Sequence, residues 1–216
     1  MKRTLALIFI TCVAGWAAPA IKDSPIVTPE RLALTRDYAQ RHYGIDDYQL
    51  KEPLAIVIHY TATRTWADTL RVFRPARLSA RRKELSGFGD LNVGVHFVVD
   101  RDGTIYRLLP EDVMGRHAIG LNYCAFGIEN VALDAAALTA AQLESNVWLV
   151  KDLARRHGTI GYLLGHHELP EKNAPHAALL RAQDPAYKPG GKSDPGPEFM
   201  RRLRGALSRA GIDLQR

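Results

Sequence analysis

The chain has 216 residues, of which 46% are hydrophobic and 24% are charged, and its formal net charge at pH 7 is +6. This length and composition suit one globular domain with a short extension, and they exclude a largely disordered chain. The basic excess is mild and is spread along the chain. It therefore favours a polyanionic partner without requiring nucleic acid.

The N-terminal segment 1–20 is predicted to be a signal peptide. Lys2 and Arg3 precede an apolar run from Leu5 to Val13, and Ala18-Pro19-Ala20 offers small residues for cleavage. The run is shorter than the roughly 20 residues that cross a bilayer as a helix. A buried N-terminal helix is the alternative. Export to the periplasm or the extracellular space is expected, and loss of Lys2 and Arg3 would lower the net charge from +6 to +4.

The two cysteines fit export without a disulfide framework. Cys12 lies in the signal segment and raises lipid attachment as a second possibility, although Thr11 before it is a poor fit to such a site. If Cys12 is removed, Cys124 is alone and has no internal partner. Cys124 lies in an apolar run and is expected to be a buried small hydrophobe.

The first elements after the signal segment are a linker and a helix. Residues 21–27 are expected to be the linker. Thr28 and Pro29 form an N-cap and first-turn signal, so a helix is predicted from there to about His42, with its end at Gly44.

The middle of the chain alternates short strands with turns. Residues 54–59 are apolar and β-branched and predict a buried strand, and residues 66–73 predict a short helix. Residues 74–92 are rich in Arg, Lys, Ser and Gly and predict a long exposed loop. A strand over 93–99 and a returning arm over 104–108 predict a hairpin.

The last part of the chain holds one long helix and a long connection. Thr139 and Gln142 resemble a capping box for a helix over 139–157. The other predicted elements are strands at 125–131 and 162–164, a proline-rich connection over 169–193 and a closing helix over 198–210. Alternating strands and helices predict an α/β fold, a sheet flanked by helices.

Three residues at the ends of these elements have metal-ligating chemistry. His59 ends the first predicted strand, His166 follows another, and Asp194 precedes the closing helix. Strand ends bring distant residues to one rim of a sheet, where two imidazoles and a carboxylate suit zinc and leave a position for water. By itself the pattern is weak, because the chain has eight histidines. A core histidine remains the alternative for His59, and a helix cap before Pro195 remains the alternative for Asp194.

Five segments carry a resemblance to a known family. They are IVIHYTAT (56–63), NVGVHFVVDRDGTIYRL (92–108), GRHAIGLNYCAFGIENV (115–131), LLGHHEL (163–169) and KSDPGPEF (192–199). In this order they resemble the zinc-dependent N-acetylmuramoyl-L-alanine amidases, which include phage lysozyme-type amidases and are related to peptidoglycan-recognition proteins. The resemblance implies a single mixed β-sheet flanked by helices, with a zinc site at one rim of the sheet. It also implies hydrolysis of the amide between N-acetylmuramic acid and L-alanine.

The resemblance assigns roles residue by residue. The metal ligands match His59, His166 rather than His167, and Asp194. A catalytic lysine matches Lys192.

Some relatives use a tyrosine where this chain has Val95, and relatives without that tyrosine have a glutamate where this chain has Glu129. A carboxylate beside zinc can move a proton from water to the leaving amine. Glu129 is therefore the expected general base and acid. His96 and His117 are expected to contact substrate in the groove or to support residues that do, and Asn122 matches a family position that can contact the stem peptide.

The chain departs from the family pattern in one segment. His166 and Asp194 are 28 residues apart, because a proline-rich insertion over 170–190 separates them. Doubling a loop costs only about 0.6 kcal/mol, so the insertion is tolerable, and we expect it to edge the substrate groove. The expected organisation is a signal peptide over 1–20, a linker and helix over 21–50, and a catalytic domain over 51–216.

The expected partner is peptidoglycan or a muropeptide, bound by a monomer. No nucleic-acid partner is expected, and membrane attachment only through Cys12. Two other functions remain open: a non-catalytic peptidoglycan-binding module and a zinc peptidase of related fold. The first is disfavoured because all three ligand positions are filled, and a panel of muropeptides against plain peptides would decide the second.

Overall fold

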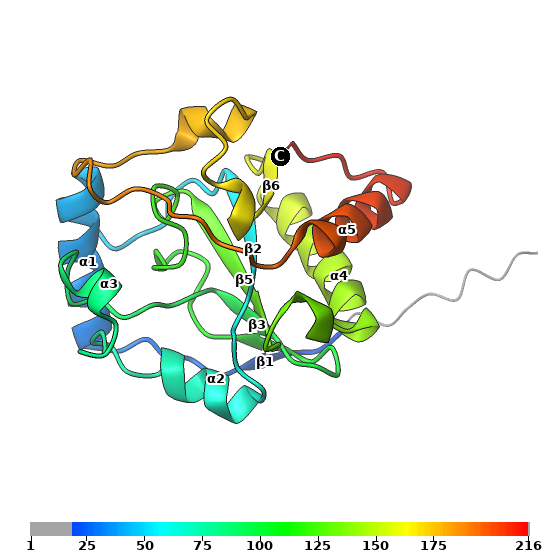
Figure 1. The fold of residues 1–216 in the computed structure, drawn as a ribbon, viewed down its shortest axis with the longest axis horizontal. Coiled ribbons are helices and arrows are strands. Elements are labelled where there is room, and N and C mark those ends of the chain that lie inside the picture. The colour runs from blue at the N-terminus through cyan, green and yellow to red at the C-terminus, as the bar shows by residue number, and fades with distance from the viewer. Residues whose placement is uncertain (1–18, 216) are drawn as a thin grey trace, which may run out of the picture.

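The computed structural model describes residues 19–215 (Figure 1). Most of the predicted signal peptide, including Cys12, lies outside the described residues. Among the residues that are described, no helix combines the length and the apolar character needed to span a bilayer. Cys124 is buried with a free thiol, as predicted, and burial raises its pKa to about 11.

Six strands form one mixed sheet in the order β1-β4-β3-β5-β2-β6. The strands are β1 Ile21–Asp23, β2 Ala55–Tyr60, β3 Phe97–Val99, β4 Ile105–Arg107, β5 Ala125–Asn130 and β6 Tyr162–Gly165. The β3–β4 hairpin is antiparallel, and the other neighbouring pairs are parallel. The expectation of a single mixed sheet flanked by helices is confirmed.

The helices α1 and α4 begin at the capping residues that the sequence predicts. In chain order, the helices are α1 Pro29–Tyr43, α2 Trp66–Phe73, α3 Lys83–Ser86, α4 Ala140–Arg156 and α5 Pro197–Arg209, with 3-10 turns η1 Ala135–Ala137, η2 His166–Glu168 and η3 Pro175–Leu179. Thr28 caps α1, and Gly44 ends it with φ 69°, a left-handed conformation that glycine adopts without strain. Thr139 and Gln142 form the predicted capping box of α4.

Three segments differ from their predicted structure. The expected linker over 21–27 contains β1, which adds a parallel edge strand to β4. The expected strand over 93–99 is regular only in β3, and before it Gly94 makes an isolated bridge to Arg116. The expected open loop over 74–92 contains α3 and is closed by a bridge. For β1 and for Gly94 the deciding hydrogen bonds come from residues far along the chain, which local pattern does not report.

The two faces of the sheet are covered by different helices. Side chains alternate along a strand, so Ile56 and Ile58 of β2 pack with Leu149 of α4 and Leu203 of α5 in one cluster. The other face carries Ala55, Val57 and His59, and the first two pack against the chain around residues 118–124. Figure 1 shows α4 and α5 on one side of the sheet and α1 on the other.

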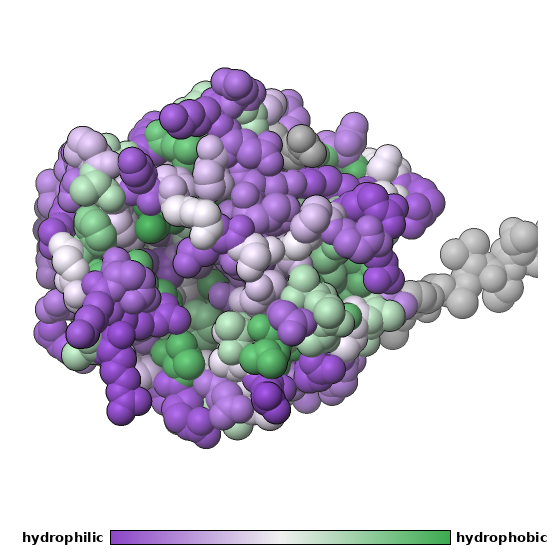
Figure 2. All heavy atoms as spheres, in the orientation of Figure 1, coloured by the Kyte–Doolittle hydropathy of each residue, from purple (hydrophilic) through white to green (hydrophobic). Residues whose placement is uncertain are grey.

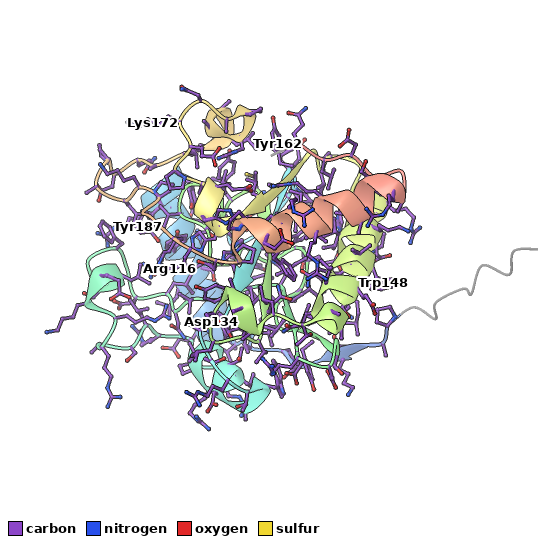
Figure 3. The ribbon with its side chains drawn as sticks, turned by 45° about the vertical axis from the view of Figure 1, so that its right-hand side comes forward. Arg116, Asp134, Trp148, Tyr162, Lys172 and Tyr187 are labelled. Atoms are coloured by element: carbon purple, nitrogen blue, oxygen red, sulfur yellow. The ribbon has the colours of Figure 1, made fainter. Side chains whose placement is uncertain are left out.

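The proline-rich insertion is fastened to the α1 side of the molecule. Tyr187 is only 2% exposed, and its hydroxyl lies 3.1 Å from that of Tyr38 in α1. The Nε of Arg116 donates to Tyr187 Oη over 3.2 Å. Figure 3 shows Tyr187 and Arg116 on the side of the molecule away from Trp148 of α4. Through Tyr187, the insertion therefore packs against the α1 side of the molecule.

Candidate metal centre

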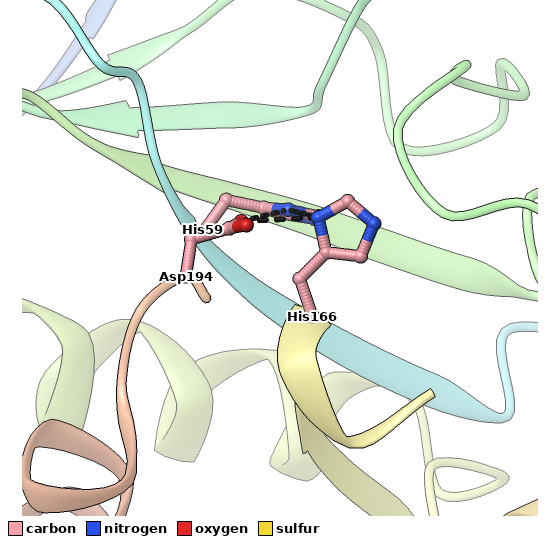
Figure 4. A group of neighbouring side chains, drawn as sticks. All are labelled: His59, His166 and Asp194. Carbon is pink, nitrogen blue, oxygen red and sulfur yellow. Dashed lines mark hydrogen bonds and ion pairs between the residues drawn. The ribbon is translucent and has the colours of Figure 1, made fainter. Parts of the chain in front are cut away.

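The three predicted metal ligands converge (Figure 4). His59 Nδ1 lies 3.0 Å from His166 Nδ1 and 3.1 Å from Asp194 Oδ2. The His166 Nδ1 atom lies 3.0 Å from the same carboxylate oxygen. One atom from each residue thus meets the others in a small triangle, as the sequence predicted.

The sheet explains why residues so far apart in the sequence meet. His59 is the fifth residue of β2, and β6 pairs parallel with β2 up to the Ile58–Gly165 pair. His166 comes directly after β6, so both imidazoles lie at the same carboxyl edge. Asp194 reaches this edge from the chain that enters α5.

Two sets of contacts hold the turn after β6 against the α5 entry. Asp194 O accepts from His167 N over 2.9 Å, and His167 Nδ1 lies 3.1 Å from the same oxygen. Glu168 accepts from Gly165 N over 2.7 Å and pairs with Arg204 of α5 through both carboxylate oxygens. These contacts span the 28-residue separation of the ligands, so the insertion does not displace Asp194.

The charge states of the cluster suit a cation. Burial lowers the pKa of His59 to about 4, so this imidazole is neutral at pH 7 despite its short contact to Asp194. Burial opposes ionisation of Asp194, but the close contacts of its carboxylate with His166 and His59 outweigh it and hold the pKa of Asp194 below its usual range. The cluster therefore offers two imidazoles and one carboxylate.

The donor set fits zinc. Zinc prefers imidazole nitrogen and carboxylate oxygen, and tetrahedral ligands at about 2.1 Å are separated from one another by about 3.4 Å. The observed separations of 3.0 to 3.1 Å are close to that value. His59, His166 and Asp194 are also the only such group of His, Cys, Asp and Glu found in residues 19–215.

A cavity of about 390 Å³ opens beside the cluster. Figure 2 shows this face hollowed between the α2–α3 segment and the chain that leads into α5. Besides the three clustered residues, its wall includes Arg82, Arg116, His117, Glu129, Tyr187 and Lys192. A cavity of this size is in the range of ligand-binding pockets, and its wall carries charged groups of both signs.

Glu129 lies next to the cluster and has a carboxylate oxygen without a partner. It is in register with His59 on the neighbouring strand β5. Its Oε2 is buried and makes no hydrogen bond within the described residues. Burial raises the pKa of Glu129 well above its usual value, and the nearby charge of Asp194 adds to the effect. A perturbed carboxyl group in a cavity is a candidate proton carrier.

Lys192 and the predicted substrate-contact residues have different placements. Lys192 is exposed and lines the cavity. His117 also lines it. Asn122 reaches the wall but is fully buried, and its amide is used internally: Oδ1 accepts from two backbone amides and Nδ2 donates to Tyr38.

His96 lies outside the cavity wall. It is fully buried and is not among the residues that line the cavity. Its Nε2 lies 2.9 Å from Val113 O, and its Nδ1 accepts from Gly127 N over 3.1 Å. With both ring nitrogens bonded to backbone, His96 has none to offer a ligand. The structure therefore places His96 among backbone groups behind the cavity, which fits the supporting role that the sequence left open for it.

Two residues of the cavity wall were not identified from the sequence. Arg82 was predicted to lie in an exposed loop, yet it lines the cavity, and its charge partly offsets the rise that burial causes in the pKa of Glu129. Tyr187 comes from the insertion. No local pattern marks either residue, because their positions depend on how two irregular segments fold back over the sheet.

Two further hydrogen bonds, outside the metal cluster, fix the backbone near His59 and Asp194. The amide of Asn130 donates to His59 O over 3.0 Å. The hydroxyl of Tyr60 lies 2.8 Å from Ser193 Oγ, next to Asp194. The IVIHYTAT and GIENV segments contain Tyr60 and Asn130, so the signal was present in the sequence, but these residues have no ligand chemistry of their own.

Comparison with known proteins gives a consistent result. A family model described as N-acetylmuramoyl-L-alanine amidase matches residues 49–197. The endolysin of Klebsiella phage KP32 is 33% identical over 138 residues, which cover 61% of this chain and 85% of that protein. The endolysin of Escherichia phage T7 is 36% identical over 100 residues, which cover 43% of this chain and 65%, slightly under two thirds, of that relative.

The solved structures include a similar fold. N-acetylmuramoyl-L-alanine amidase LysC from Clostridium intestinale URNW superposes with a TM-score of 0.52 at 21% identity. The superposition covers 90% of this chain and 99% of that one. At this identity the likeness shows a common fold.

Proposed function

The chain belongs to the N-acetylmuramoyl-L-alanine amidase family, and on this basis we propose that it hydrolyses the amide between N-acetylmuramic acid and L-alanine in a zinc-dependent reaction. The substrate would be peptidoglycan or its fragments. One observation carries the proposal: His59, His166 and Asp194 meet within 3.1 Å, beside a glutamate whose buried oxygen has no partner.

The residues of the cavity divide the chemistry between them. Zinc, when bound by His59, His166 and Asp194, supplies a Lewis acid that polarises the scissile carbonyl and acidifies water. Glu129 accepts a proton from the attacking water and delivers it to the leaving amine of L-alanine. Lys192 places its ammonium group where negative charge develops on the carbonyl oxygen. His117 and Asn122 line the same cavity.

Several properties of the whole protein belong to the same proposal. Peptidoglycan lies outside the cytoplasm, so the proposal includes the predicted signal peptide over 1–20 and a periplasmic or extracellular location. We propose a soluble monomer whose catalytic domain spans 51–216, with attachment through Cys12 as the alternative. The insertion over 170–190 contributes Tyr187 to the cavity wall, which supports its predicted position at the groove.

The test is mass spectrometry of purified peptidoglycan and of a defined muropeptide after incubation with the purified chain. The expected products are free stem peptide with an L-alanine amino terminus and peptide-free glycan. A chelator should abolish them, and added zinc should restore them. Zinc bound in equimolar amount without release of that amine would refute the amidase. Wall binding without turnover would indicate a binding module, and cleavage of plain peptides would indicate a peptidase.

A further inference from the structure

A second imidazole lies behind the first metal-ligating histidine. His117 Nδ1 is 3.1 Å from His59 Nε2, the ring nitrogen that points away from the metal cluster. His117 Nε2 is 3.2 Å from Ala125 O. The two rings meet edge to face at 87°. A continuous line of contacts thus runs from a backbone carbonyl through His117 and His59 to the cluster.

The protons along this line can be assigned from the carbonyl outward. Ala125 O only accepts, so His117 Nε2 must carry a hydrogen. The ring of His117 contacts a carbonyl oxygen and another imidazole, and its ring nitrogens have no acidic partner in residues 19–215, so nothing compensates a charge on this ring and it is neutral. Its Nδ1 is therefore an acceptor. His59 Nε2 must then carry the hydrogen that lies between the two rings.

This assignment has one consequence at the metal cluster. A neutral imidazole carries one proton, so a hydrogen on His59 Nε2 leaves a lone pair on Nδ1. That lone pair faces His166 Nδ1 and Asp194 Oδ2 at 3.0 and 3.1 Å. We propose that His117 is a positioning residue that fixes His59 in its Nε2–H tautomer and so presents Nδ1 to a divalent cation. The proposal rests on the zinc-dependent function above.

The surroundings of His117 hold its ring in the required position. A Cβ built on Gly127 would lie 2.8 to 2.9 Å from three atoms of the ring, and one on Gly115 would lie 3.0 Å from it. Asn122 Oδ1 accepts from the backbone amides of His117 and Ala118 over 2.9 and 2.7 Å. Two glycines thus make room for the imidazole, and Asn122 fixes the backbone that carries it.

The expected effect of losing this support is weaker metal binding. An outer hydrogen-bond partner that orients a ligating histidine typically contributes 10- to 100-fold to metal affinity. Without His117, His59 is free to carry its proton on Nδ1, and that proton must be displaced before a cation binds. The cost therefore falls on binding of zinc itself, before any substrate is present.

Two variants of the full chain separate the hydrogen bond from simple space filling. His117→Phe keeps a flat ring but removes both hydrogen bonds, and His117→Gln keeps an acceptor for His59 and a donor for Ala125. Zinc affinity is measured by competition with a chromophoric chelator. We expect a 10- to 100-fold loss for His117→Phe and at least tenfold recovery relative to it for His117→Gln. Wild-type affinity in His117→Phe, or equal losses in both variants, would overturn the proposal.

A spectroscopic measurement tests the tautomer without any substitution. Zinc-free wild-type protein labelled with ¹⁵N-histidine is examined by long-range proton–nitrogen correlation, which distinguishes protonated from unprotonated ring nitrogens. We expect both His59 and His117 as Nε2–H tautomers, and a proton on His59 Nδ1 would overturn the proposal. If the wild-type chain bound no zinc, the proposed function would fail, whereas the tautomers of the zinc-free protein would still decide the inference.

Discussion

Two glutamates at the same edge of the sheet differ in their hydrogen-bond partners and in the direction of their pKa shifts. Glu168, in the turn after β6, accepts from Gly165 N and forms a two-pronged pair with Arg204. Although burial opposes its ionisation, these partners hold the pKa of Glu168 below its usual value. Glu129, on β5, has a buried oxygen without a partner, and burial raises its pKa.

The difference indicates a structural role for Glu168 and a catalytic role for Glu129. A buried carboxylate costs free energy unless it is hydrogen-bonded, and the structure compensates that cost completely at Glu168. There the carboxylate ties the His166 turn to α5. The structure leaves Glu129 uncompensated beside a cavity, where a carboxyl group with a mobile proton is useful. Substitutions at the two sites should therefore change different properties.

The largest expected effect is on turnover. Glu129→Gln keeps the shape of the side chain but removes its ability to accept a proton, so amide hydrolysis should fall by about 10²- to 10⁴-fold. Zinc content, measured by elemental analysis, should stay at the wild-type level, because Glu129 is not among the clustered ligands. Normal turnover in this variant would remove Glu129 from the mechanism.

The next largest effect is on stability, at the other glutamate. Arg204→Met leaves Glu168 buried without its cation, and we expect the free energy of unfolding in urea to fall by about 3 kcal/mol. That value is the low end for a buried pair, because the Arg204 side chain is 24% exposed. The double variant with Glu168→Gln should recover part of the loss. Unchanged stability in Arg204→Met would show that the pair contributes little.

The pH dependence of stability should have opposite signs at the two sites in the zinc-free protein. The folded pKa of Glu168 is lowered, so its contribution is present above the unfolded value of about 4.3 and is lost as pH falls. Glu168→Gln should therefore destabilise most near pH 7.

The folded pKa of Glu129 is raised, so its cost is absent below about 4.3 and grows as pH rises towards the folded pKa. Glu129→Gln should therefore stabilise near pH 7 and have no effect near pH 3. Urea denaturation of both variants and the wild type across this pH range checks the two signs. Parallel profiles for the two variants would contradict the comparison.

The smallest expected effect is on stability at Thr139, a residue far from both glutamates that serves as a control. Thr139 caps α4 through a single accepted hydrogen bond from Gln142 N over 3.1 Å. Thr139→Ala should lower the free energy of unfolding by about 1 kcal/mol, with turnover and zinc affinity unchanged. A larger loss than that of Arg204→Met would reverse the expected ranking.

Much of the fold was predictable because its signals are local. The ends of α1 and α4 follow from Thr28, Gly44 and the Thr139 capping box. The strand β2 follows from a short β-branched run. The segment β1 was not predictable, because three residues become a strand only through a partner about eighty positions away.

The residues of the candidate site also fall into those that the sequence predicted and those that only the tertiary structure placed. The chemistry and position of His59, His166 and Asp194 at the ends of predicted elements indicated a possible metal site, and the family resemblance strengthened that prediction and added Glu129 and Lys192. Which histidines face the cavity was decided only by the tertiary structure. His96 and His117 both lie in segments of the family resemblance, yet one is enclosed by backbone groups and the other touches His59. Burial and hydrogen-bond partners arise when distant segments pack together, and no residue encodes them alone.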